Sequence, residues 1–286
     1  MAAQPVLLNG NWQESAGSET FTATNPARKS ALSEPFPISP WEEIEQVLRA
    51  AHAAFVAVRG WPGARFAAFL EGYAERIEER ADAIVERAHE ETALPIEPRL
   101  KSVELPRTTN QLRQAAAAAR EGSWRRATID TQAGIRSMLA PLGPVAVFGP
   151  NNFPCAFNSI AGGDFAAAVA AGNPVIAKGH SSHPGTTRLF GEAAHDAARA
   201  ADMPPGFVQL VYRCSHVDGA KLVSHPRLGA TGYTGSREAG LVLKEAADRG
   251  GKPIYLELSS INPVFILPGA LRERLDAIAD ELTTSC

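Results

Sequence analysis

The second half of this chain carries the pattern that most constrains its fold. From Gly143 onward, short apolar runs typical of buried strands alternate with segments of helical spacing. The expected strands are Val145–Phe148, Val175–Ala177, Phe207–Val211, Leu228–Gly232 and Ile254–Leu258, and the expected helices are Ile160–Ala171, Thr186–Ala201, Val217–Ser224 and Ser236–Arg249. Such β-α repeats predict an α/β fold with a doubly wound parallel sheet, in which ligands bind beyond the carboxyl ends of the strands.

The first half has a different pattern. Residues 6–37 mix short apolar pieces with turn residues, which predicts edge β structure. Ser39-Pro40-Trp41-Glu42 reads as a capping box that starts a helix ending near Arg59. Two further helical stretches are expected, at Ala64–Glu91, whose charge run is interpreted as a solvated face, and at Pro98–Glu121, which is kinked or broken near Pro106. Residues 123–142 predict a β-hairpin that needs a packing partner.

Composition excludes several classes of function. The chain has 286 residues, 45% of them hydrophobic, so it can bury a core, and its net charge of −3 gives no attraction to nucleic acid. The longest apolar stretch, residues 160–177, is interrupted by Asp164, Asn173 and Pro174, so no membrane span or signal peptide is expected. Three cysteines without a pairing pattern fit a reducing compartment, and we expect a cytoplasmic protein.

Polar residues follow two of the expected strands in positions suited to ligand binding. The turn Gly149-Pro150-Asn151-Asn152-Phe153-Pro154 presents an amide that could stabilise a developing oxyanion, or an Asx-turn that caps the next helix. Lys178 could meet a ribose or phosphate, or be a solvated lysine. His180 and His183 lack a third ligand, so no metal site is expected.

Two more segments follow the later strands. Residues 235–240 form a G-x-x-x-x-G turn that opens a helix, so its N–H groups could face a pyrophosphate, although any tight strand-to-helix turn could look this way. Glu257 stands alone in an apolar strand end. Such a carboxyl tends to have a raised pKa and can act as a general base, with a salt-bridged structural role as the alternative.

Together, the segments resemble the aldehyde dehydrogenase superfamily. Residues 151–154 resemble its oxyanion loop, 172–178 its adenosine-side strand, 235–240 its pyrophosphate turn and 256–263 its general-base segment, in the same order. Details at 178–184 and 257–260 resemble the branch of ketoglutarate-semialdehyde (2,5-dioxopentanoate) and NADP-dependent fatty aldehyde dehydrogenases. The resemblance implies a Rossmann-like NAD(P)-binding core at 143–262, after an N-terminal β and helical part at 1–122 and an oligomerisation hairpin at 123–142, with a catalytic domain beginning at 263–286.

The resemblance also implies roles for individual residues. Asn152 would donate its amide to the substrate oxyanion, and Glu257 would activate the water that hydrolyses a thioester. Lys178 and Ser181 would lie against the adenosine ribose, and Gly235 and Ser236 would hold the pyrophosphate; the other expected cofactor-binding positions are Pro150, Ala239, Gly240 and Leu258. NAD-preferring relatives commonly carry glutamate where this chain has Ser181. A carboxylate would repel a 2′-phosphate, so we expect NADP⁺, with NAD⁺ as the alternative.

The family's nucleophile is a cysteine in a Gly-Gln-x-Cys type of segment. Cys286 follows Thr283-Thr284-Ser285 and does not fit, so the nucleophile is expected beyond residue 286, and Cys155 and Cys214 are expected to be packed thiols. The implied function is NAD(P)⁺-dependent oxidation of an aldehyde, such as ketoglutarate semialdehyde, to the carboxylate through a cysteine thiohemiacetal and thioester. A full-length homo-oligomer would do this, and this truncated chain would be inactive. The alternative is a non-catalytic nucleotide-binding or oligomerisation module.

Overall fold

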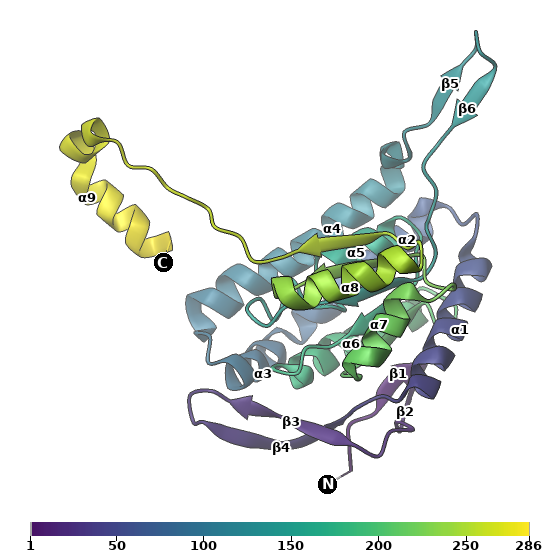
Figure 1. The fold of residues 1–286 in the computed structure, drawn as a ribbon, viewed down its shortest axis with the longest axis horizontal. Helices are drawn as coiled ribbons and strands as arrows, with labels where there is room; N and C mark the ends of the chain where they lie inside the picture. Colours follow the sequence, from purple (N-terminus) through teal and green to yellow (C-terminus); the bar gives the residue numbers. More distant parts are fainter. Residues whose placement is uncertain (1, 286) are drawn as a thin grey trace.

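A seven-stranded sheet forms the centre of the computed structural model, which describes residues 2–285 (Figure 1). The strand order is β11-β10-β7-β8-β9-β1-β2, and neighbours among the first five strands are parallel. The strands of this sheet are β1 Val6–Leu8, β2 Asn11–Gln13, β7 Val145–Phe148, β8 Val175–Lys178, β9 Val208–Val211, β10 Ala230–Thr234 and β11 Ile254–Glu257. The five parallel strands lie within two residues of the predicted runs. β7, β8, β9 and β10 are buried on both faces, whereas β11 alternates half-buried and exposed residues.

Helices cover both faces of the sheet, as the doubly wound prediction requires (Figure 1). Alternate strand residues point to opposite faces: Val145 and Val147 join one hydrophobic cluster, whereas Ala146 and Phe148 join the other. The first cluster contains α2 Gly63–Glu79, α4 Leu105–Glu121, α5 Gly163–Ala170 and α6 Pro184–Ala200; the second contains α1 Trp41–Val58, α7 His216–Ser224 and α8 Arg237–Arg249.

The helices of the first half differ from the sequence prediction at three points. The proposed capping box is wrong, because Pro40 occupies the N-cap position and the buried Ser39 hydroxyl makes no hydrogen bond with the described residues. The single helix expected over residues 64–91 is two, α2 and α3 Ala81–Thr92, which meet at Arg80. The break expected near Pro106 lies elsewhere: Glu104 and Leu105 keep right-handed helical dihedrals where the π-helical segment η1 Ile96–Glu104 passes into α4, and the non-helical backbone is at Glu97.

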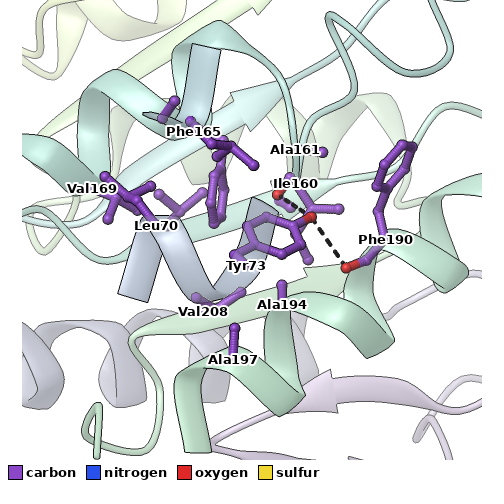
Figure 2. Close-up of a cluster of buried hydrophobic side chains, with 14 of the residues drawn as sticks. Leu70, Tyr73, Ile160, Ala161, Phe165, Val169, Phe190, Ala194, Ala197 and Val208 are labelled. Carbon is purple, nitrogen blue, oxygen red and sulfur yellow. Dashed lines mark hydrogen bonds between the residues drawn. The ribbon is translucent and has the colours of Figure 1, made fainter. Parts of the chain in front are cut away.

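Tyr73 of α2 joins the N-terminal helices to the core of the sheet. Its ring is fully buried beside Phe165 of α5, and its hydroxyl lies 3.1 Å from the carbonyl oxygens of both Ile160 and Phe190 (Figure 2). A buried hydroxyl requires such partners. One side chain therefore ties α2 to the segment after β7 and to α6.

Three parts lie outside the central sheet. A second sheet pairs β3 Thr20–Asn25 with β4 Ser30–Pro37. The predicted ribbon, β5 Thr128–Asp130 and β6 Ile135–Ser137 after the short η2 Ser123–Arg125, projects away from the body with both strands exposed (Figure 1). After β11 the chain runs extended to α9 Pro268–Ser285, which lies apart from the sheet (Figure 1). In the described part of the chain, no helix has the length and apolar character needed to cross a membrane.

Candidate functional site

The largest depression near the predicted residues is a cleft of about 680 Å³ at the carboxyl ends of the parallel strands. Its walls come from the segments after β7, β8, β9 and β10. The chain passes from β7 to β8 and β9 on one side and returns to β10 on the other, so the cleft lies where the strand order reverses. Open α/β sheets bind their ligands at this point. Of the expected cofactor positions, Pro150, Lys178, Gly235, Ser236 and Ala239 line the cleft.

The loop after β7 carries Asn151 and Asn152, which are both exposed; Asn151 lines the cleft, and Asn152 follows it just outside the lining. The Asn152 carbonyl accepts a hydrogen bond of 3.0 Å from Arg99 Nη2. Further along, the N–H groups of Cys155 and Ala156 donate to one carboxylate oxygen of Glu104, at 2.8 and 3.1 Å. The loop is therefore held from η1.

The segment after β8 places a lysine and two histidines beside the cleft. Lys178 Nζ lies 5.5 Å from the centre of the Phe148 ring, and burial lowers the pKa of its ammonium group. Burial and the neighbouring His183 and Lys178 lower the pKa of His180 to about 3, so that ring is neutral at physiological pH. His183 Nε2 lies 2.9 Å from the Pro150 carbonyl oxygen and links this segment to the loop after β7. Ser181 is half-buried next to the cleft lining.

The turn after β10 opens α8 with a well-formed cap. The hydroxyl of Ser236 accepts from the N–H of Ala239, and the Tyr233 hydroxyl donates to the Ser236 carbonyl. Gly240 lies under Leu258, since a Cβ on Gly240 would be 2.4 Å from Leu258 Cδ2. The predicted turn therefore brings a capped helix N-terminus to the cleft, where backbone N–H groups favour an anion.

Glu257 stands at the end of β11, opposite Thr234 of β10 in the strand register. The expected apolar enclosure of this carboxyl is wrong: its side chain is exposed, because β11 is the outer strand of the sheet. Desolvation and the negative charge of Glu257 both raise the pKa of Asp164, at the start of α5. Glu257 and Asn152 thus lie at the same edge of the sheet, on strands separated by β10.

The cysteines of the described residues have different surroundings. Cys155 is fully buried, and burial together with the charge of Glu104 raises the pKa of its thiol, as a packed thiol requires. Cys214 is half-buried and lines the cleft near Lys178, and burial raises its pKa as well. Cys286 lies outside the described residues.

Sequence reasoning missed two buried glutamates that support the cleft. Glu104 binds the loop after β7, and Glu91 of α3 accepts from the N–H groups of Gly185 and Thr186, both at 2.8 Å, at the start of α6. Burial raises the pKa of both carboxyls, against the N–H donors and the nearby arginines that lower it. Glu91 belongs to a charge run that was interpreted as a solvated face, Glu104 was given no role, and no local signal in the sequence distinguishes either residue.

Comparisons with known proteins agree with this geometry. The family model described as "Aldehyde dehydrogenase family" matches residues 12–285. The alpha-ketoglutaric semialdehyde dehydrogenase 2 of Azospirillum brasilense is 43% identical over 96% of this chain and 54% of its own length, and the alpha-ketoglutaric semialdehyde dehydrogenase of Acinetobacter baylyi is 36% identical over 98% and 54%. The chain therefore spans about half the length of these curated relatives.

Solved structures give the same result for the fold. A mutant of aldehyde dehydrogenase C from Pseudomonas syringae, in complex with NAD⁺ and octanal, superimposes with a TM-score of 0.82 at 25% identity, over 93% of this chain and 52% of that one. A putative aldehyde dehydrogenase from Burkholderia cenocepacia gives 0.80 at 25% identity, over 91% and 51%. This chain belongs to the aldehyde dehydrogenase family.

Proposed function

We propose that this chain forms the nucleotide-binding part of an NADP⁺-accepting aldehyde dehydrogenase acting on ketoglutarate semialdehyde or a related aldehyde. The observation that carries the proposal is the cleft at the reversal of the strand order, which brings together Pro150, Lys178, Gly235 and Ser236. The identity to two semialdehyde dehydrogenases supports the substrate class.

The described residues suit a dinucleotide. The capped N-terminus of α8 presents N–H groups for a pyrophosphate, and the partly buried Lys178 ammonium, for which no ion pair is found among residues 2–285, suits a ribose or phosphate oxygen. When bound, the nucleotide supplies a hydride acceptor. The chain's own residues hold it, and the exposed amide of Asn152 can donate to an oxyanion while the carboxylate of Glu257 can accept a proton from water.

The direct test of the proposal is cofactor preference, measured as the affinity of the 286-residue chain for NADP⁺ and for NAD⁺ by titration. We expect NADP⁺ to bind more tightly by severalfold. Ser181→Glu should weaken NADP⁺ binding about tenfold or more and spare NAD⁺, because a carboxylate repels the 2′-phosphate. Ser182→Glu, one residue further along and also half-buried, is the matched control and should have the smaller effect. NAD⁺ binding severalfold more tightly than NADP⁺ would overturn this assignment of Ser181.

Activity measurements separate the enzyme from a non-catalytic module. The chain alone should form no NADPH with ketoglutarate semialdehyde or a long-chain aldehyde, since Cys155 is buried in the core and burial raises the pKa of the Cys214 thiol, which disfavours the nucleophilic thiolate. A protein that continues through the second half found in its relatives should oxidise ketoglutarate semialdehyde faster than a long-chain aldehyde. Failure of that longer protein with every aldehyde and both cofactors would favour the module.

The exposed ribbon favours assembly of several copies. Its outward side chains include Ile129, Ile135 and Met138, each at least 60% exposed, on a two-stranded unit that is marginal alone in water. We therefore propose that the ribbon binds a second copy of the protein. Sedimentation should detect a dimer or tetramer that Ile129→Ser with Ile135→Ser dissociates; an unchanged assembly would count against the ribbon as the contact.

A further inference from the structure

We propose that Arg99 and Glu104 act as one positioning unit, which holds the backbone of Asn152 at the edge of the cleft. The catalytic importance of this position rests on the proposed function, in which Asn152 donates to an oxyanion. The way Arg99 and Glu104 hold the loop is a property of this chain, and it can be measured without aldehyde or nucleotide.

Glu104 fixes the far side of the loop. Its side chain is completely buried at the end of η1, and Oε1 accepts from the N–H groups of both Cys155 and Ala156. Without Glu104, these two buried N–H groups would have no other acceptor among the backbone hydrogen bonds of the loop, and an unpaired buried N–H group is costly. The carboxylate therefore determines where residues 155 and 156 lie.

Arg99 fixes the near side. Its Nη2 atom donates to the Asn152 carbonyl at 3.0 Å and lies 3.4 Å from Glu104 Oε2. The guanidinium also lies over the Phe153 ring, 4.2 Å from its centre. Because Oε2 makes no hydrogen bond with the described residues, the charge of Arg99 is its nearest compensation. One short segment, residues 99–104, thus binds the loop at residues 152, 155 and 156.

Filling the space beside the loop does not by itself require a buried carboxylate. An apolar side chain could fill the space of Glu104 without the cost of burying a carboxylate. Arg107 lies over the Phe153 and Phe157 rings, 5.8 and 5.0 Å from their centres, and its charge lowers the pKa of Glu104. Within residues 2–285 it makes no hydrogen bond to the backbone of the loop, so it packs beside the loop without binding it. Glu91 provides an internal comparison, because it is equally buried and binds two N–H groups at the start of α6.

Cys155 is a natural reporter of this loop. Its thiol is fully buried, so alkylation by N-ethylmaleimide requires the loop to open, whereas the half-buried Cys214 lies after β9. The experiment follows the labelling rate of each cysteine by peptide mass spectrometry in the wild type, Arg99→Met, Glu104→Gln and the double variant. Glu91→Gln is the matched control.

Arg99→Met removes the bond to the Asn152 carbonyl, and Glu104→Gln keeps an acceptor for the N–H groups of Cys155 and Ala156 but replaces charge-assisted bonds by neutral ones and loses the ion pair with Arg99. We expect each variant to accelerate labelling of Cys155 about tenfold, with Cys214 unchanged. The double variant should be no faster than the faster single variant, because the two residues act together. Glu91→Gln should leave Cys155 within about twofold of the wild type. Three outcomes would each contradict the joint action of Arg99 and Glu104. These are an unchanged labelling rate of Cys155 in the single variants, a rate in the double variant equal to the product of the two single effects, and an effect of Glu91→Gln as large as that of Glu104→Gln. Failure to bind nucleotide would overturn the proposed function and leave this result standing.

Discussion

The two sides of the cleft are supported in different ways. On the β7 and β8 side, each loop is bound by a buried carboxylate, Glu104 or Glu91, from the helical segment of residues 81–104. On the β10 and β11 side, the turn is held by its own Ser236 cap, and Glu257 is exposed. Tyr255 of β11 is 63% exposed. Long-range buried bonds therefore fix one wall, and short-range contacts within the turn fix the other.

This difference predicts that the loss in the free energy of unfolding depends on which wall of the cleft carries the substitution. Replacing the buried carboxylates should cost most, because buried N–H groups then lose their acceptors. Changes on the β10 and β11 wall should cost little stability even where they alter ligand binding. Three substitutions measure the contrast, from the largest expected effect to the smallest.

Glu91→Leu should have the largest effect. It leaves the N–H groups of Gly185 and Thr186 unpaired and removes a partner of Arg87, so we expect a loss of about 3–5 kcal/mol in the free energy of unfolding in urea. Glu90→Leu is the control one residue earlier, since Glu90 also pairs with Arg87 but is more exposed, and it should cost below about 1 kcal/mol. Equal losses for the two variants would mean that the carboxylate does not hold the wall.

Gly149→Ala should follow, on the same wall. A Cβ at this position would lie 2.6 Å from the Phe157 carbonyl oxygen and 2.8 Å from the Ser159 nitrogen, both backbone atoms that cannot move independently. We expect a loss of about 2–3 kcal/mol, which is typical of overpacking, from the urea midpoint at constant slope. A Gly149→Ala variant as stable as the wild type would show that the backbone at Gly149 is loosely packed against residues 157–159.

Gly240→Ala, on the opposite wall, should have the smallest effect. Its Cβ would meet the flexible end of Leu258, which can turn aside on the outer part of the sheet, and would lie 3.1 Å from Tyr233 Cε1, a tight contact that a small shift of the ring relieves. Alanine also favours the helix over glycine by about 1 kcal/mol, so the net change in stability should be near zero. A loss as large as that of Gly149→Ala would remove the distinction between the walls.

The sequence predicted the strands well and the supports of the loops poorly. The inner parallel strands were identifiable because burial on both faces leaves an apolar signature, and the turn after β10 followed from Gly235 and Gly240. Glu91 and Glu104 were not predicted, since a carboxylate in a helix with neighbouring charges looks solvated until a distant loop covers it. The exposure of Glu257 was missed for a related reason: the local apolar pattern does not show that β11 is outermost.

The placement of β1 has a consequence for synthesis of the chain. Leu7 pairs with Leu210 of β9, and the Tyr212 hydroxyl bonds to the Pro5 carbonyl, so the first strand finds its neighbour some two hundred positions later. During synthesis on the ribosome, the apolar strand β1 therefore lacks its neighbour β9 until β9 has emerged. Fusion partners placed directly before Gln4 would crowd this late docking step, and a tag at the other terminus avoids it.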